Sequence, residues 1–208
     1  SLSQDVAIYG HIPYTTCREA IMQIAFACGW VIDTSDSNVL NIYKLDNEIS
    51  QNIPLNRILQ GQNFDEESEI TAVEVTAHLY EASTDLQGME RVVLYDASKN
   101  GAGQNIKLMF DKPMYTISIT GGELLENSAN HAIFNISDGG LLIGYQYNYT
   151  AFRRTKVNPS ITDSDTENII SVENATLVSL QNVDEVLERC YNHYVNGRKI
   201  NLKIVEGK

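Results

Sequence analysis

Two amphipathic segments at opposite ends of the chain constrain its fold most. In the first, Thr15–Trp30, Thr16 stands three residues before Glu19, which is the spacing of a helix capping box, and Gly29 follows as a stop signal. The second is Asn174–Lys199. Their apolar residues, at helical spacing, are Ile21, Ile24, Ala25 and Cys28 in the first helix and Val183, Val186, Leu187, Cys190, Tyr191 and Tyr194 in the second. Because an amphipathic helix must cover its apolar stripe, both helices are expected to pack on a sheet.

The stretch between the two helices has the pattern of β-strands. In Ile70–Tyr80, Val73, Val75 and Ala77 alternate with polar residues, with the period of two that a half-buried strand requires. Further strands are predicted at Arg91–Tyr95, Asn105–Phe110, Met114–Thr120, His131–Ser137, Leu141–Lys156, Ile169–Glu173 and Lys199–Val205. Turn signals separate several of them: SKNGAGQ, DKP and the glycine pairs Gly121–Gly122 and Gly139–Gly140. Repeated turns at this spacing indicate an antiparallel sheet or barrel.

The sequence therefore predicts an α+β protein, a mostly antiparallel β-sheet or barrel crossed by an amphipathic helix, with a small additional lobe. Residues 1–46 form that lobe, a helix followed by a hairpin of Trp30–Asp33 and Val39–Leu45. Residues 47–69 form a polar connector with an acidic run, and residues 70–208 form the larger β domain with its C-terminal helix and strand.

Composition limits the classes of partner. The formal net charge of −12 argues against a surface that binds nucleic-acid phosphates over a wide area. It is the charge of an ordinary soluble protein or of an acidic channel that does not retain DNA. The three cysteines, Cys17, Cys28 and Cys190, are predicted to be small buried thiols of a protein made in a reducing cytoplasm. No apolar stretch reaches the ~20 residues of a membrane span, so membrane insertion is not expected.

The residue patterns predict neither an enzyme nor a metal or cofactor site. The four histidines are far apart in the sequence, there is no CxxC pair, and no nucleophile motif or phosphate-binding loop is present. One candidate binding face remains, Tyr145, Tyr147 and Tyr149, which would suit either a sugar ring or a covering helix. A basic cluster, Arg153, Arg154 and Lys156, would suit either an intermolecular salt bridge or a solvated strand end.

Four segments carry a family resemblance. CREAIMQIAFACGWVIDTS, ITAVEVTAHLY, FDKPMYTISITGG and NATLVSLQNVDEVLERCYNHY, in this order, resemble tail and baseplate proteins of prophages from Gram-positive bacteria. The larger group is the baseplate-hub family, which includes late-control protein D. The resemblance implies a structural, non-catalytic component of a virion tail, made in the bacterial cytoplasm. It also implies self-association, typically as a trimer whose β domains form a ring around a channel, and contact with other tail proteins. The alternative function is a carbohydrate-binding module that uses the tyrosine face.

Overall fold

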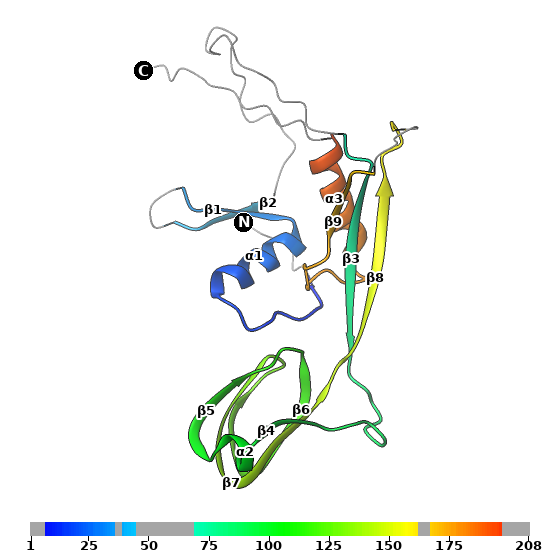
Figure 1. Ribbon diagram of the computed structural model, residues 1–208. Helices are drawn as coiled ribbons and strands as arrows, with labels where there is room; N and C mark the ends of the chain where they lie inside the picture. Colours follow the sequence, from blue (N-terminus) through cyan, green and yellow to red (C-terminus); the bar gives the residue numbers. More distant parts are fainter. Residues whose placement is uncertain (1–6, 36–38, 45–68, 162–166, 197–208) are drawn as a thin grey trace.

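The computed structural model describes residues 7–35, 39–44, 69–161 and 167–196. Within these residues the strands form open, mostly antiparallel sheets, so the predicted α+β class is confirmed and a closed barrel is not formed. Figure 1 shows a small lobe and a helix-covered sheet at one end of the molecule and a curved sheet at the other. The long strands β3 (Ala72–Glu81) and β8 (Asn148–Val157) run between the two ends.

The small lobe contains helix α1 (Cys17–Cys28) and the antiparallel hairpin of β1 (Trp30–Asp33) and β2 (Asn41–Lys44). The helix begins with the predicted capping box: the Thr16 hydroxyl accepts a hydrogen bond from the Glu19 amide, and the Glu19 carboxylate accepts one from the Thr16 amide. It ends at Gly29, whose φ of 70° lies in the left-handed region that favours glycine. Both predicted helix signals are therefore confirmed.

The apolar stripe of α1 is only partly covered. Ala25 is buried and Ile24 is half-buried, but Ile21 is 41% exposed. The expected burial of the whole stripe is wrong because the helix packs on a two-stranded hairpin rather than on a broad sheet. The prediction that all three cysteines are buried is confirmed for Cys190 alone: Cys28 is intermediate, and Cys17 is exposed, so the prediction is wrong for Cys17.

Helix α3 (Val183–Tyr191) covers a three-stranded sheet of order β8, β3, β9 (Ile169–Val172). β8 pairs antiparallel with β3, and β9 pairs parallel with it. The buried residues of this first core are Val73, Val75, Ala77, Val178, Val183, Val186, Leu187, Cys190 and Tyr191. The predicted packing of the second helix on a sheet is therefore confirmed.

Tyr194 is the exception in the predicted stripe, since it is 38% exposed. The chain leaves the α-helix at Tyr191 and continues as a wider π-helical turn, Asn192–Asn196, so the α-helical spacing no longer applies there. On the other side of α3, Glu188 lies at the surface and pairs with Lys156 of β8.

The second sheet is built around the strand β7 (His131–Gln146). β6 (Met114–Asn127) runs antiparallel along it, while β4 (Val92–Asp96) pairs with its second half and β5 (Gly103–Met109) with its first half. The short helix α2 (Ala97–Asn100) joins β4 to β5. The buried residues of this second core are Ala97, Phe110, Met114, Ala132, Phe134, Ile136 and Leu142.

The glycine pairs that were predicted to end strands bend them instead. β6 continues through Gly121 and Gly122, and β7 continues through Gly139 and Gly140. At the bend the two backbones approach so closely that a Cβ on Gly122 would lie 2.2 Å from the Asn135 carbonyl oxygen. Glycine is required here for close approach, so the predicted turns at both pairs are wrong.

Residues 82–91 lead from β3 of the first sheet to β4 of the second, and two further connections join the two cores. Tyr147 alone separates β7 from β8, so the single strand predicted from Leu141 to Lys156 is divided there. The N-terminal segment, residues 10–14, forms the other connection: the His11 amide donates to the Thr176 carbonyl oxygen, and the Asn130 side chain donates to the Ile12 carbonyl oxygen. The predicted connector and the predicted closing strand Lys199–Val205 lie outside the described residues, apart from Glu69 at the connector's end.

Candidate functional site

The uncovered face of the three-stranded sheet is polar. Residues that pair in register lie on the same face of a sheet, so the partners Glu74–Thr155 and Thr76–Arg153 both lie opposite α3. This polar face is hollowed by a cavity of about 540 Å³. The cavity is lined by Thr76, His78, Tyr80, Tyr149, Ala151, Arg153, Glu173, Asn174 and Thr176. We call it the sheet cavity.

The charged side chains at the sheet cavity pair within the chain. The Arg153 guanidinium lies 3.4 Å from the Glu74 carboxylate and 3.4 Å from the Glu173 carboxylate. The Arg153 side chain is 59% exposed, so water screens these pairs and they contribute little to stability. They orient the three side chains across the polar face and leave it without a strong charge of either sign.

Three aromatic rings form one wall of the sheet cavity. Tyr149 and Tyr80 have ring centroids 5.1 Å apart, and His78 stacks on Tyr149 at 5.9 Å. His78 Nδ1 lies 2.9 Å from the Tyr149 hydroxyl, while its Nε2 atom is buried without a hydrogen-bond partner among the described residues. Burial lowers the pKa of the His78 imidazole, and the backbone of Glu173 partly opposes that shift. A neutral His78 therefore holds the Tyr149 hydroxyl in place.

The three predicted tyrosines do not form one continuous face. Tyr145 is buried and its hydroxyl accepts a hydrogen bond from Arg91. Tyr147 lies between the two strands and packs on Tyr115, with ring centroids 4.8 Å apart. Tyr149 is 50% exposed and lines the sheet cavity.

The basic cluster is divided between the two faces of the sheet. Arg153 lies on the polar face, whereas Lys156 reaches α3, where its ammonium group pairs with Glu188 and lies 4.3 Å from the centre of the Tyr191 ring. Arg154 is exposed, and no ion pair of its side chain is found among the described residues. Two of the three predicted interface residues thus have partners within the same chain.

The small lobe carries an apolar groove of about 610 Å³ that sequence reasoning missed. It is lined by Arg18, Ile21, Met22, Ala25, Phe26, Trp30, Ile32, Thr34 and Leu40. Met22 and Phe26 are four residues apart, so they form a second apolar stripe beside the one predicted for α1. Two neighbouring apolar stripes make the apolar surface of α1 wider than one hairpin covers, and the spacing of Met22 and Phe26 in the sequence could have predicted this.

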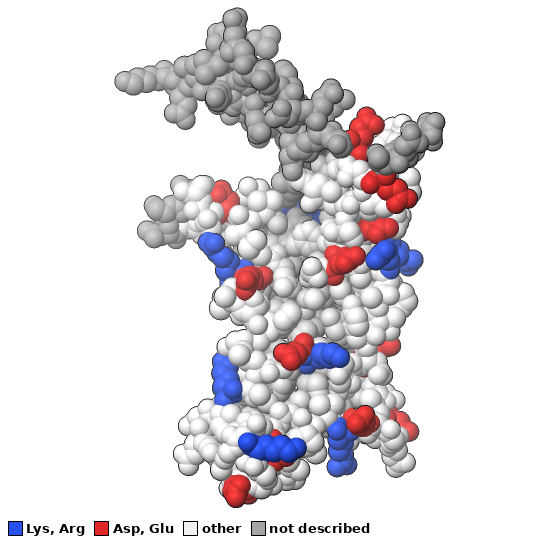
Figure 2. Space-filling model, viewed as in Figure 1, with Lys and Arg blue, Asp and Glu red and all other residues white. Residues whose placement is uncertain are grey.

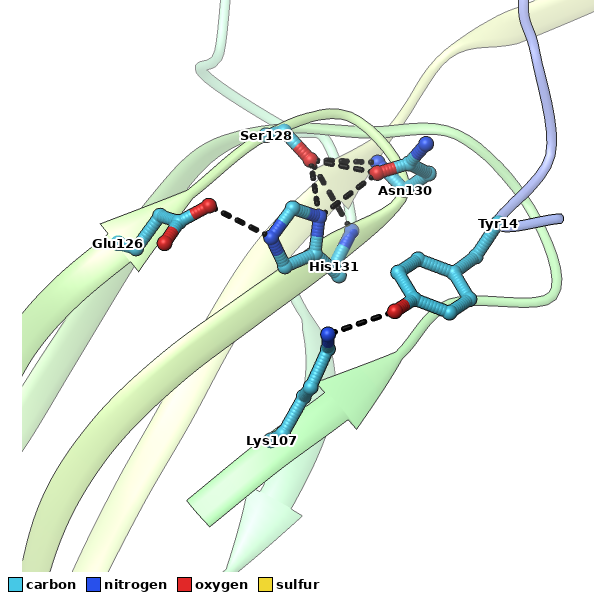
Figure 3. A network of polar contacts seen from close by, with 6 residues as sticks. All are labelled: Tyr14, Lys107, Glu126, Ser128, Asn130 and His131. Carbon is cyan, nitrogen blue, oxygen red and sulfur yellow. Dashed lines mark hydrogen bonds and ion pairs between the residues drawn. The ribbon is translucent and has the colours of Figure 1, made fainter. Parts of the chain in front are cut away.

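A polar network lies at the turn between β6 and β7 (Figure 3). Ser128 Oγ lies 2.8 Å from His131 Nδ1, and His131 Nε2 lies 3.0 Å from the Glu126 carboxylate. Beside it, the Lys107 ammonium group donates to the Tyr14 hydroxyl at 2.6 Å (Figure 3). The spacing Glu-x-Ser-x-x-His within a strand turn is the only sequence signal for this network.

The distances in this network match those of a serine–histidine–carboxylate triad, but the Ser128 hydroxyl already makes hydrogen bonds to other groups. Ser128 Oγ accepts hydrogen bonds from the amides of Asn130 and His131, and it donates to the Asn130 side-chain oxygen. The Asn130 amide group in turn donates to the Ile12 carbonyl oxygen at 3.0 Å. The network therefore fastens the N-terminal segment to the turn rather than exposing a nucleophile.

Other features of the described residues bear on ligands. Figure 2 shows charged side chains of both signs over most of the visible face, with several acidic side chains gathered at its upper right. In the part of the chain that the structure describes, no group of three or more His, Cys, Asp or Glu residues could hold a metal ion. Nor is any described helix both long and apolar enough to cross a membrane.

Comparison of the chain with family models, with curated proteins and with solved structures finds no match.

Proposed function

We propose that the chain is a structural component of a phage or prophage tail, near the baseplate hub, where it assembles with copies of itself around a channel and contacts other tail proteins. One observation carries the proposal: the three-stranded sheet has one face covered by α3, a polar opposite face, and an edge strand, β8, that no described strand pairs on its outer side. A subunit of a ring needs these three features, with the helix outside, the polar face toward the channel and an edge toward a neighbour.

The polar face has the properties of a channel wall that does not retain DNA. Its two carboxylates, Glu74 and Glu173, both pair with Arg153, and the chain as a whole carries a charge of −12. Retention of duplex DNA requires several uncompensated cations that displace counterions from the phosphates. A face with a single paired guanidinium would let DNA pass.

The β8 edge supplies a contact for a neighbouring copy. Its ten residues span about 33 Å at the rise of an extended strand, and nearly all of its side chains are exposed. An open edge of that length presents a row of unpaired amide and carbonyl groups, which is a template for association with another chain. Self-association is therefore the use of this edge that fits the resemblance of the sequence to tail proteins.

Sedimentation velocity over a wide concentration range, with electron microscopy of the associated fraction, tests the proposal. We expect self-association that grows with concentration, particles with threefold symmetry, and no retention of duplex DNA at physiological salt. A complex with a small interface dissociates on dilution, so the measurement extends to the highest soluble concentration. A strict monomer throughout, or tight binding of duplex DNA, would contradict it.

The sheet cavity favours a second candidate function, carbohydrate binding. Tyr149 presents a half-exposed ring, and Arg153, Glu173 and Asn174 place hydrogen-bond donors and acceptors around it, a combination that suits the apolar face and the hydroxyl groups of a sugar. A glycan array separates the two candidates. A signal that disappears in Tyr149→Ala and persists in Tyr43→Ala, a matched exposed tyrosine of the lobe, would support the sugar site.

A further inference from the structure

The apolar groove of the small lobe, which we call the lobe groove, is lined by one side of α1 and by one face of the β1–β2 hairpin. On α1 the lining residues follow one another at intervals of three and four, as a single helical stripe does: Arg18, Ile21, Met22, Ala25 and Phe26. In β1, Trp30 and Ile32 line the groove, while Val31 and its partner Tyr43 lie on the other face of the hairpin. The lobe groove therefore has a helical wall and a hairpin wall.

The size of the lobe groove suits a small molecule rather than a protein. Its volume of about 610 Å³ is within the ~300–1,000 Å³ of typical small-molecule pockets. Four of its large apolar side chains are 38% to 59% exposed: Ile21, Met22, Phe26 and Leu40. At about 180 Å² for each side chain, they expose roughly 350 Å², which is less than half of the ~800 Å² that each partner of a stable protein complex buries.

Arg18 is the single charged residue among those that line the lobe groove. It is exposed, and its guanidinium makes no ion pair or hydrogen bond with the residues that the structure describes. The neighbouring carboxylate in the sequence, Glu19, is engaged instead by the hydroxyl groups of Thr15 and Thr16. A guanidinium binds a carboxylate through two parallel hydrogen bonds, so Arg18 supplies a cation that suits an anionic group at an otherwise apolar site.

The cation stands at one end of the helical stripe and the apolar residues follow it. Arg18 precedes Phe26 by eight residues, so the stripe is about 12 Å long at the rise of an α-helix. A straight chain of about ten carbons, with bonds of ~1.5 Å at tetrahedral angles, has the same length. The lobe groove thus has the charge and the length that suit an amphiphile with an anionic head and one hydrocarbon chain.

We propose that the lobe groove binds the free anion of a fatty acid of about ten carbons, with the carboxylate at Arg18 and the chain along Met22 and Phe26. The chain covers the apolar side chains that the hairpin leaves exposed, and the carboxylate pairs with the unpaired guanidinium. This inference is independent of the proposed function, because it concerns a small molecule at a surface that the proposed function does not use.

Trp30 lines the lobe groove and is the only tryptophan of the chain, so its fluorescence reports binding. The probes are hexanoate, octanoate, decanoate, dodecanoate and tetradecanoate, each kept below the concentration at which it forms micelles. We expect a saturable shift to shorter wavelength. Complete burial of two methylenes tightens binding about 15-fold, so in this half-open groove each step should tighten it about fivefold, up to about ten carbons, and then level off. No saturable shift, or affinity that rises equally at every step, would overturn the inference.

Variants of Arg18 test the role of the charge. Arg18→Gln should bind decanoate at least about tenfold more weakly than the parent and bind decanol equally well, whereas Arg18→Lys should retain most of the affinity for decanoate. Arg154→Gln is the matched control, since Arg154 is also exposed and has no ion pair among the described residues. It should bind decanoate as the parent does. Equal binding of decanoate by Arg18→Gln and the parent would contradict the assignment of Arg18.

Variants of Met22 test the position of the chain. Met22→Glu places a carboxylate in the groove and should abolish the decanoate signal. Met109→Glu is its control, since Met109 is 57% exposed against 59% for Met22 and lies in the other sheet. If Met22→Glu unfolds, as judged by circular dichroism, Leu40→Glu on the hairpin takes its place, since Leu40 is 53% exposed. Decanoate binding that survives in the folded variant would place the ligand elsewhere and overturn the inference.

Vesicles distinguish a free fatty acid from the lipid of a membrane. The parent protein is sedimented with vesicles of phosphatidylglycerol and, separately, of phosphatidylcholine. We expect it to stay in the supernatant with both, because the groove accommodates one chain and carries one cation. Sedimentation with the anionic vesicles, together with no saturable response to decanoate, would overturn the inference and identify the lobe as a surface that docks on membranes.

Discussion

Replacement of Leu187 by alanine tests the first core most directly. The Leu187 side chain is 9% exposed and lies among Val183, Val186 and the β3 residues Val73 and Val75. The change removes three buried carbon groups at about 0.8 kcal/mol each, or about 2.4 kcal/mol of transfer free energy. The surrounding valines have stiff side chains and cannot fill the space, so a residual cavity of about 40 Å³ would add about 1 kcal/mol. The expected loss of unfolding free energy is therefore about 3.5 kcal/mol.

Urea and thermal unfolding followed by circular dichroism measure this loss. For a chain of this size, about 3.5 kcal/mol corresponds to a fall in melting temperature of roughly 7 to 14 °C. Glu185→Ala is the matched control on the same helix: its side chain is 82% exposed, and the change should cost less than about 0.5 kcal/mol. If Leu187→Ala melted within a degree of the parent, the packing of α3 on β3 described above would be wrong.

Three further predictions concern other parts of the molecule. Gly122→Ala should destabilise the fold far more than Gly88→Ala, because a Cβ at Gly122 would lie 2.2 Å from a backbone atom. A Cβ at Gly88 meets no atom, so that substitution costs only the ~1–2 kcal/mol of a left-handed φ, and thermal melts compare the two variants. Burial lowers the pKa of His78 below its ordinary 6.5, so the contribution of the neutral imidazole to stability is present above about pH 6.5 and is lost as the pH falls. The melting temperature of His78→Asn should therefore fall less steeply than that of the parent between about pH 7.5 and 5. Arg189→Met removes both hydrogen bonds to the end of α1, so the fluorescence of Trp30 should shift to longer wavelength, and an unchanged spectrum would refute that contact.

Local signals in the sequence predicted local structure well. The capping box of Thr16 and Glu19 and the stop at Gly29 depend only on neighbouring residues, and both are present. The alternation of Val73, Val75 and Ala77 predicted the covered face of β3, because a period of two does not depend on the identity of the partner strand. The glycine pairs were misread because the same residue serves a chain reversal and a bend, and the difference depends on the opposite strand.

The candidate site was less predictable because its residues come together only when β3, β8 and β9 pair in the sheet. His78 occupies a position that alternation assigns to solvent, yet it is 6% exposed, since the ring of Tyr149 covers it from a strand 71 positions away. The parallel addition of β9, which brings Glu173 to Arg153, left no local pattern either. In the tyrosine run, the break at Tyr147 separates Tyr145, which is buried in the second sheet, from Tyr149, which lies half exposed on the polar face of the first.

The N-terminal segment that joins the two cores has a consequence for the order of folding. Its partner Asn130 lies 118 positions further along the chain than Ile12, and Arg189 lies 163 positions beyond Phe26. During synthesis the lobe therefore emerges long before either surface on which it docks, and the end of α1 lacks its contact with α3 until Arg189 has been made. Contacts over such separations in the sequence make the docking of the N-terminal segment a slow step of folding.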